Sequence, residues 1–314
     1  MKWIQELREG DNITEIYLCK KKQSLVTKAG KAYESLTLQD KTGSLDAKIW
    51  EPDSMGIDEF SELDYIEATG NITSYQGHLQ FNIRRVRRCR DGECDPADYL
   101  PVSGLSVDDM YQKLLNLVDS VGDPYMKRLL EMFFREDEDF IKAFKKSSAA
   151  KAVHHGFVGG LLEHTLGVAQ LCDYYSSAYP IIRRDLLVPA ALLHDIGKTR
   201  ELSLFPKNDY TDDGQLIGHI VLGVEMINDK LREIPDFPQA LSSQLRHCIL
   251  AHHGELEFGS PKKPALVEAA ALFFADNTDA KFEIFKETFE NALPQEAWVG
   301  YQSFLGSNIR RTIF

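Results

Sequence analysis

The hydrophobic pattern of the chain changes its period near residue 90, and this change restricts the folds that it can adopt. Up to Arg88, apolar and polar residues alternate in short runs separated by turn residues, which is typical of β-strands. From Val107 onward, apolar residues recur at helical spacing. At about 100–200 residues per domain, the 314 residues suffice for two domains. We therefore expect a small all-β domain followed by a larger all-α domain.

The first domain is expected to be a small closed barrel, because it offers five short strands and no long helix. The expected strands are residues 13–22, 31–39, 44–50, 65–73 and 78–88. A turn-rich, acidic stretch with two prolines follows and has the composition of a linker. The predicted division is thus a barrel over residues 1–92, a linker over 93–103 and a helical domain over 104–314. Its expected helices are residues 107–118, 125–134, 138–146, 161–175, 186–196, 217–232, 238–251, 264–278 and 280–291.

The net charge of −12 is unevenly distributed. Residues 1–90 carry 14 basic and 14 acidic side chains, so the whole negative charge belongs to the rest of the chain. A neutral domain with clustered lysines and arginines can still bind a phosphate backbone, and the charge therefore does not exclude a nucleic-acid partner.

The cysteines and the hydropathy indicate the compartment. Five scattered cysteines are typical of reduced thiols rather than of a disulfide framework. The sequence has no run of 18 apolar residues and no apolar segment near Met1 that resembles a signal peptide. We expect a cytoplasmic protein without a membrane segment.

Histidine is concentrated in the helical domain, where eight of the nine histidines lie between His154 and His253. An almost wholly apolar helix ends at His194-Asp195. A buried carboxylate is unfavourable by several kcal/mol unless it is paired or binds a metal. A structural hydrogen bond between the two side chains would explain this pair on its own.

The other helices favour a shared metal centre over that simpler explanation. Each of them also places histidine or aspartate among apolar neighbours: His164, His219, the pair His252-His253, and Asp276. Imidazoles and carboxylates without thiolates suit Mn, Fe, Co or Zn. Seven such ligands are too many for one ion but suffice for two if a carboxylate bridges them. Paired metal ions are typical of phosphoester hydrolysis.

The ordered set His164, His194-Asp195 and Asp276 resembles the HD-domain superfamily of metal-dependent phosphohydrolases. Over essentially its whole length, the chain resembles the YhaM-type 3′→5′ exoribonucleases, which join an OB-fold barrel to an HD domain. The segments GGLLEHT, HDIGKTREL and AHHGELEFGSPKKP carry this resemblance. Phosphodiesterases of the HD-GYP type share HDIGK and the histidine pair, but this chain lacks their Gly-Tyr-Pro signature after His253.

The resemblance implies roles for the residues of the centre. One ion would be held by His164, His194, Asp195 and Asp276, and the second by His219, His252 and His253, with Asp195 as the bridge. Mn²⁺ is the preferred metal, with Fe, Co or Zn as alternatives. Asp195 and Lys198 are the predicted catalytic residues, with Lys198 on the scissile phosphate. The alternative for Lys198 is a solvated lysine that the helix dipole favours.

Further residues are candidates for substrate binding. The resemblance makes His154 or His155 a phosphate contact, although a solvent-exposed pair fits equally. Lys262 and Lys263 form a basic loop that guides RNA or is merely solvated. In the barrel, we expect RNA bases to stack on aromatic rings and basic side chains to contact the phosphate backbone of the RNA. The candidates there are Trp50, Tyr75, Arg85 and Arg87, and charge that protects an edge strand is the alternative for the arginines.

These features, together with the resemblance for the polarity, predict a metal-dependent 3′→5′ exoribonuclease that degrades single-stranded RNA to nucleoside 5′-monophosphates. Single-stranded DNA is left open as a second substrate. One alternative is an HD phosphohydrolase acting on a small nucleotide, for which the barrel would have no obvious use. A second is a non-enzymatic RNA-binding protein with an inactive HD domain, which the complete ligand set disfavours. Assembly into a homo-oligomer is left open.

Overall fold

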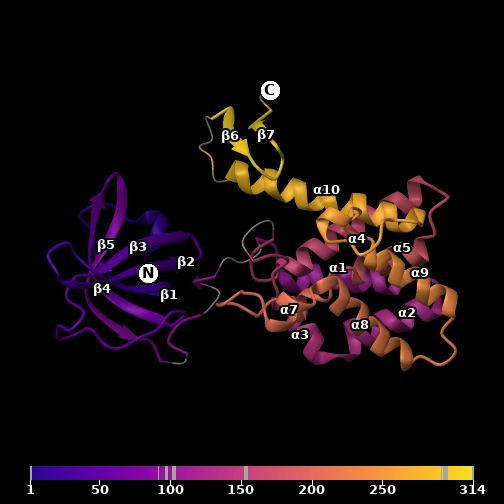
Figure 1. Ribbon diagram of the computed structural model, residues 1–314, viewed down its shortest axis with the longest axis horizontal. Coiled ribbons are helices and arrows are strands. Elements are labelled where there is room, and N and C mark those ends of the chain that lie inside the picture. Colours follow the sequence, from indigo (N-terminus) through magenta and orange to yellow (C-terminus); the bar gives the residue numbers. More distant parts are fainter. Residues whose placement is uncertain are drawn as a thin grey trace. The chain divides into compact units, whose positions relative to one another are not determined.

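The computed structural model describes residues 2–90, 92–95, 98–100, 104–151, 155–290, 292 and 296–312. Its contacts divide the chain into two units, Met1–Val102 and Ser103–Phe314 (Figure 1). Each unit has a hydrophobic core of its own. Part of the predicted linker packs on the first unit, because Gln39 Nε2 donates a hydrogen bond to the carbonyl oxygen of Tyr99 at 3.1 Å.

The first unit is a closed barrel of five strands. The strands are β1 (Asn12–Val26), β2 (Ala32–Asp40), β3 (Gly43–Ile49), β4 (Tyr65–Tyr75) and β5 (His78–Arg88). They are hydrogen-bonded in the order β1-β2-β3-β5-β4, and β4 closes the barrel by pairing antiparallel with β1. β3 and β5 form the parallel pair. This arrangement is the five-stranded barrel of an OB fold and confirms the predicted strands, with β1 longer than expected.

The barrel core follows from the alternation of each strand. In β3, Leu45, Ala47 and Ile49 are buried and the residues between them are exposed or half-buried. β4 and β5 add Ile66, Ile72 and Phe81 to the same interior. Polar side chains consequently lie on the outer surface of β5, which carries two of the predicted RNA contacts, Arg85 and Arg87.

The second unit is built mainly from helices. They are α1 (Val107–Asp119), α2 (Pro124–Glu131), α3 (Glu138–Lys146), α4 (Gly160–Ala178), α5 (Arg184–Leu193), α6 (Lys198–Glu201), α7 (Asp212–Leu216), α8 (His219–Arg232), α9 (Gln239–Leu250) and α10 (Val267–Glu290). A π-helical turn, Met132–Glu136, follows α2. Ser106 caps α1, because its hydroxyl accepts a hydrogen bond from the Asp109 amide at 3.3 Å.

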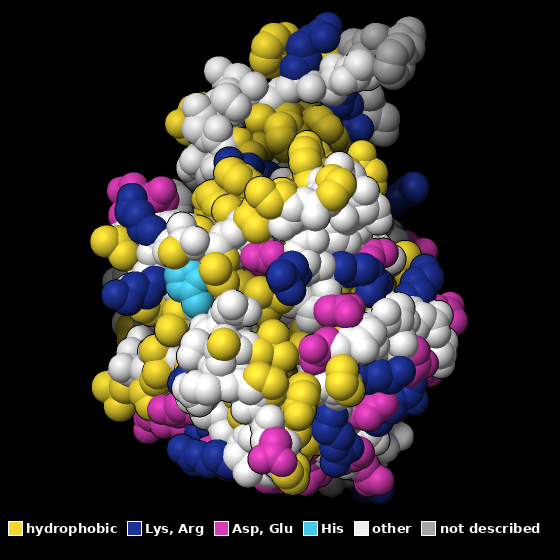
Figure 2. All heavy atoms as spheres, turned by 90° about the vertical axis from the view of Figure 1, so that its right-hand side faces the viewer, with side chains coloured by type: hydrophobic (Ala, Val, Ile, Leu, Met, Phe, Trp, Pro, Cys, Tyr) yellow, Lys and Arg dark blue, Asp and Glu magenta, His cyan; other side chains and the backbone are white. Residues whose placement is uncertain are grey.

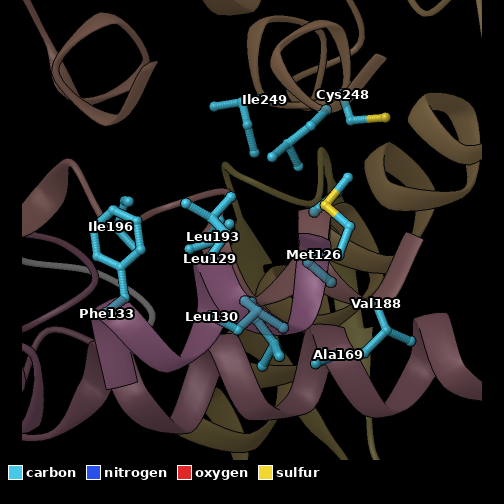
Figure 3. Close-up of a cluster of buried hydrophobic side chains, with 14 of the residues drawn as sticks. Met126, Leu129, Leu130, Phe133, Ala169, Val188, Leu193, Ile196, Cys248 and Ile249 are labelled. Carbon is cyan, nitrogen blue, oxygen red and sulfur yellow. The ribbon is translucent and has the colours of Figure 1, made fainter. Parts of the chain in front are cut away.

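Helix α5 lies at the centre of this unit. Every residue from Leu186 to Leu193 is buried, as the apolar sequence predicts. Figure 3 shows Val188 and Leu193 of α5 in one cluster with side chains of α2, α4 and α9, among them Leu129, Ala169 and Ile249. The His194-Asp195 pair that follows α5 is therefore held in the interior by the packing of the helix before it.

The structure corrects two expectations for the second unit. The predicted helices 264–278 and 280–291 are one helix, α10, because no glycine or proline interrupts the chain between Val267 and Glu290. The unit is also not all-α, since β6 (Trp298–Gln302) and β7 (Ser307–Arg310) form an antiparallel hairpin. Strands of five and four residues are too short to give a clear alternating pattern.

The surface of the second unit has no dominant charge in the view of Figure 2. Among the described residues on that face, Lys and Arg are interspersed with Asp and Glu, and hydrophobic side chains gather above the middle. Within the described part of the chain, none of the helices has the length and apolar character needed to cross a membrane.

Candidate metal centre

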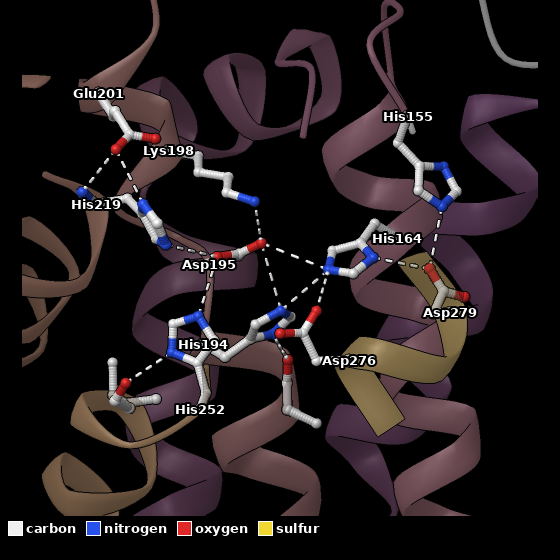
Figure 4. Close-up of polar contacts among 12 residues, drawn as sticks. His155, His164, His194, Asp195, Lys198, Glu201, His219, His252, Asp276 and Asp279 are labelled. Atoms are coloured by element: carbon white, nitrogen blue, oxygen red, sulfur yellow. Dashed lines mark hydrogen bonds and ion pairs between the residues drawn. The ribbon is translucent and has the colours of Figure 1, made fainter. Parts of the chain in front are cut away.

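Six segments of the second unit bring their polar side chains together at one place (Figure 4). Helix α4 supplies His164 and the turn after α5 supplies His194 and Asp195, with Lys198 beginning α6. His219 begins α8, His252 and His253 follow the end of α9, and Asp276 and Asp279 lie on α10. The helices that the sequence predicts to carry isolated polar residues thus converge.

One group of ligand atoms surrounds His164. His164, His194 and Asp276 each offer an atom within 4.8 Å of the others. His164 Nε2 is 3.2 Å from His194 Nε2 and 3.2 Å from Asp276 Oδ1. Both imidazoles are buried, whereas 17% of the Asp276 side chain is exposed.

A second group consists of His219, His252 and His253, whose ligand atoms also lie within 4.8 Å of one another. Asp195 connects the two groups. Its Oδ2 is 3.4 Å from His194 Nε2 and 3.5 Å from His164 Nε2. Its Oδ1 is 3.5 Å from His219 Nε2 and 3.6 Å from His252 Nε2. Each carboxylate oxygen therefore faces one group, which is the placement that a bridging ligand requires.

The other ring nitrogens of these histidines are fixed by acceptors. His194 Nδ1 and His252 Nδ1 each donate to a backbone carbonyl, of Ala191 and Ile249, at 2.7 Å. His219 Nδ1 lies 2.9 Å from Glu201 Oε1, and His164 Nδ1 lies 2.8 Å from Asp279 Oδ2. Acceptors of this kind hold the tautomer in which Nε2 faces the centre, as in metal-binding histidines generally.

Gly197 permits the close approach of the segment that carries His219. A Cβ at Gly197 would lie 2.0 Å from the backbone oxygen of His219 and 2.7 Å from the nitrogen of Gly223. The glycine of the HDIGK segment is thus required by packing against α8. The position of the second histidine group depends on this contact.

Burial and charge set the protonation of the centre. Burial lowers the pKa of His164, but the hydrogen bonds that its ring donates to the carboxylates of Asp276 and Asp279 outweigh this effect and raise the pKa to about 10. Burial opposes ionisation of Asp195, yet Lys198 and His194 hold its pKa well below its usual range. For His252, burial and the neighbouring His253 lower the pKa well below its usual value. The carboxylates around His164 thus create a site that favours a positive charge, which a proton supplies when no metal ion is bound, and a metal ion would displace that proton. His252 is neutral, as a metal-binding imidazole must be.

Three buried atoms of the centre lack a partner of the kind that a cation would supply. Asp195 Oδ1, His219 Nε2 and His252 Nε2 are buried, and none of them has a hydrogen-bond partner. Leaving one such group unsatisfied costs about 1–3 kcal/mol. A cation among them would satisfy the lone pairs of all three, so the donor set fits a divalent transition metal.

A cavity of about 510 Å³ opens beside the centre. It is lined by His164, Lys198, His253 and Asp276, together with Ala149, Phe273, Asn277, Ala280 and Phe304. Lys198 Nζ is 2.6 Å from Asp195 Oδ2, and 15% of its side chain is exposed. α5 ends at Leu193, so Lys198 reaches the centre from the first residue of α6 rather than along one continuous helix.

The other residues of this unit that were predicted to contact the substrate lie in different surroundings. His154 lies outside the described residues. His155 is buried, and its Nε2 is 3.0 Å from Asp279 Oδ2, so it packs behind the centre rather than on an exposed surface. Lys262 and Lys263 are exposed, and Lys263 pairs with Glu255 at 2.6 Å. Substrate contact by these residues stays a prediction.

The predicted contacts of the barrel lie on its surface. Trp50 is 47% exposed, stacks on Tyr33 with ring centroids 5.1 Å apart, and donates from Nε1 to Asn82 Oδ1 at 2.9 Å. Tyr75 and Arg85 are also exposed. Arg87 is paired with Glu67 at 2.8 Å and Glu93 at 2.7 Å, and these carboxylates would compete with a phosphate for its guanidinium.

Two residues of the centre, Asp279 and Glu201, were not predicted from the sequence. Asp279 lies one helical turn after Asp276, a spacing that places both on the same face of α10. That spacing could have identified Asp279. The sequence around Glu201 does not predict its hydrogen bond with His219, because the two residues come into contact only when α6 packs on α8.

Replacing Asp279 with Asn should weaken metal binding without removing a ligand. The variant loses the negative charge that orients His164, and loss of such a partner typically costs about 10- to 100-fold in metal affinity or activity. The Mn²⁺ concentration for half-maximal RNA hydrolysis should rise by that factor, with activity restored at saturating Mn²⁺. Asp229→Asn, at an exposed ion pair with Arg232, is the control. An unchanged Mn²⁺ requirement would exclude this role for Asp279.

Comparison with known proteins agrees with this architecture. The HD domain model matches residues 161–281, the region that carries all seven predicted ligands. The 3′-5′ exoribonuclease YhaM of Geobacillus sp. (strain WCH70) is 31% identical over 296 residues, which cover 94% of this chain and 90% of that protein. YhaM of Bacillus subtilis (strain 168) is 30% identical over 289 residues, covering 91% and 90%.

Among solved structures, the second OB-fold domain of replication protein A from Methanococcus maripaludis matches 29% of this chain and 96% of its own. The identity is 21% and the TM-score is 0.23. The exoribonuclease relatives, in contrast, extend over both units of this chain. The chain therefore belongs to the family of YhaM 3′-5′ exoribonucleases.

Proposed function

We propose that this protein is a metal-dependent exoribonuclease that removes nucleoside 5′-monophosphates from the 3′ end of single-stranded RNA. The placement of Asp195 between two histidine groups carries the proposal, because each oxygen faces a separate group. Its relatives named as 3′-5′ exoribonucleases support the same reaction. Single-stranded DNA is proposed as a second substrate.

We assign the following roles to the residues of the centre. One ion would be held by His164, His194 and Asp276, and the other by His219, His252 and His253. Asp195 would bind both ions. When bound, paired ions activate a water and stabilise charge on phosphate oxygens. Mn²⁺ is the proposed metal. The Nε2 atoms of His194, His219 and His252 and both Asp195 oxygens face the centre and suit that task.

Lys198 is proposed to contact the scissile phosphate. Its ammonium lies at the cavity beside the ligands, and Asp195 holds the side chain in place at 2.6 Å. Burial lowers the pKa of Lys198, but Asp195 outweighs this effect and raises it, so the side chain stays positive. A fixed positive charge there would stabilise charge that develops on the phosphate.

A phosphohydrolase acting on a small nucleotide is the second candidate. A cavity of about 510 Å³ lies within the usual range for small-molecule sites. The two candidates are separated by a time course with Mn²⁺ on single-stranded RNA labelled at either end. The proposal expects mononucleotide release from the 3′ label and a progressively shortened ladder from the 5′ label. Intact RNA alongside hydrolysis of a free nucleotide would overturn it.

The barrel is proposed to bind the RNA upstream of the cleaved end. Removing residues 1–102 should leave a folded helical unit, because the two units have separate cores. Activity on a very short oligonucleotide should survive, since every predicted ligand lies beyond residue 160. Activity on long single strands should fall, because stacking on exposed rings such as Trp50 is lost.

The salt dependence of RNA binding tests this division of roles. Each neutralised phosphate of a single strand contributes a slope of about −0.7 to the dependence of log affinity on log salt. RNA affinity of the full-length protein in chelator, where cleavage is blocked, should therefore fall more steeply with salt than that of the truncated protein. Equal affinities and equal slopes would mean that the barrel is not an RNA-binding module.

A further inference from the structure

The hairpin of β6 and β7 lies beyond the matched HD region and had no predicted role. Its two strands are joined by the four-residue turn Ser303-Phe304-Leu305-Gly306. Hydrogen bonds from the Leu305 amide to the Gln302 oxygen and from the Gly306 amide to the Ser303 oxygen, both 3.2 Å, define this turn. The hairpin follows α10, the helix that carries Asp276 (Figure 1).

Contacts with the end of α10 hold the hairpin in place. Gln302 Nε2 donates to Thr288 Oγ1 at 3.3 Å. The guanidinium of Arg311 lies 5.1 Å from the ring centre of Phe289, and its Nη2 donates to the Ala292 oxygen at 3.2 Å. Because the hairpin is anchored to the helix that supplies Asp276, its turn has a defined position relative to the centre.

The turn places Phe304 in the wall of the cavity described above. The same cavity is lined by His164, Lys198, His253 and Asp276. Phe304 is 57% exposed, and its ring forms part of the cavity wall beside the charged centre. A second ring, Phe273 of α10, lines the cavity as well. A wall that combines aromatic rings with a lysine and the proposed metal ligands suits a nucleotide, which joins an apolar base to a charged phosphate.

We propose that Phe304 is the surface on which the base at the 3′ end of the RNA stacks while its phosphate lies at the metal centre. This inference rests on the proposed function and names a substrate-binding residue for it. Stacking on an aromatic ring is tolerant of sequence because every base has a flat face. An enzyme that removes successive nucleotides of any sequence needs this kind of recognition at its terminal site.

The hairpin also supplies a matched control. Tyr301 is 67% exposed on β6 and is not among the residues that line the cavity. Phe304→Ala and Tyr301→Ala therefore each remove an exposed ring from the same hairpin, but only the first removes it from the cavity. Phe304→Trp retains a stacking surface and is the rescue variant.

The test uses the full-length protein and two short oligoribonucleotides that differ only at the 3′ terminus. One ends in an ordinary nucleotide and the other in an abasic ribose. Loss of one base–aromatic stack corresponds to about a 5- to 150-fold change. Phe304→Ala should lower kcat/KM by this factor on the ordinary end and leave the abasic end at its wild-type value. Phe304→Trp should restore activity, and Tyr301→Ala should leave it unchanged.

The possible failures can be told apart. Equal losses on both oligonucleotides would mean that Phe304 only supports the fold of the hairpin, and the inference would be overturned. Full activity of Phe304→Ala on the ordinary end would overturn it as well, while the proposed function would stand. A wild-type protein that leaves both RNAs intact would overturn the proposed function and this inference with it.

Discussion

Asp195→Asn should abolish RNA hydrolysis while leaving the protein folded. An amide oxygen is a weaker ligand than a carboxylate, and the amide nitrogen cannot bind a cation at all. One of the two histidine groups would therefore lose its link to the other. Removing only the hydrogen-bond partner of a metal ligand typically lowers metal affinity or activity by up to about 100-fold. Because Asp195→Asn changes the ligand itself, we expect the rate of hydrolysis to fall by more than about 100-fold. Initial rates on 3′-labelled RNA with saturating Mn²⁺ measure this loss.

The same variant needs a check on its fold and a matched substitution. Circular dichroism and the thermal unfolding midpoint should show that Asp195→Asn is still folded. Asp229→Asn changes the same chemical group on the exposed part of α8, where Asp229 pairs with Arg232 at 3.0 Å, and should retain full activity. Near wild-type turnover by Asp195→Asn would refute the bridging assignment.

Gly197→Ala should be nearly as damaging, although it changes no ligand. Its Cβ would lie 2.0 Å from the backbone oxygen of His219, so the N-terminus of α8 would have to move. Displacing a reacting group by about 1 Å can cost about 100-fold in rate, and overpacking typically destabilises a protein by about 1–3 kcal/mol. We expect a loss of that size in kcat, accompanied by weaker binding of the second Mn²⁺ ion.

Gly223, which lies opposite Gly197 in the same contact, supplies the control. A Cβ at Gly223 would meet Gly197 atoms at 3.5 Å and 3.8 Å, which are ordinary contact distances. Gly223→Ala should therefore fold and hydrolyse RNA like the wild type. If the two variants behaved alike, close packing at Gly197 would not be what positions His219.

Much of the fold can be read from the sequence because each unit has a strong local pattern. Leu45, Ala47 and Ile49 alternate along β3, and the apolar run that forms α5 requires burial. The hairpin after α10 was not predicted, since its short strands are stabilised by contacts with the helix rather than by a pattern of their own.

The centre was predictable only in part, for a similar reason. A histidine or aspartate among apolar residues, such as His164 or Asp276, is visible in the sequence because burial of a polar group needs an explanation. The roles of Asp279, Glu201 and Phe304 depend on which helices and turns pack together. No local pattern contains that information, so the structure was needed to identify them.

The central claim is that two ions share Asp195, and the number of ions bound per chain tests it most directly. Metal-free protein titrated with Mn²⁺, with the free ion followed by electron paramagnetic resonance, should bind two ions per chain. His252→Ala should bind one ion and lose activity. His247→Ala should still bind two, because His247 Nε2 instead accepts a hydrogen bond from the Ala265 amide at 2.9 Å. A fully active wild-type protein that binds a single ion would contradict the account.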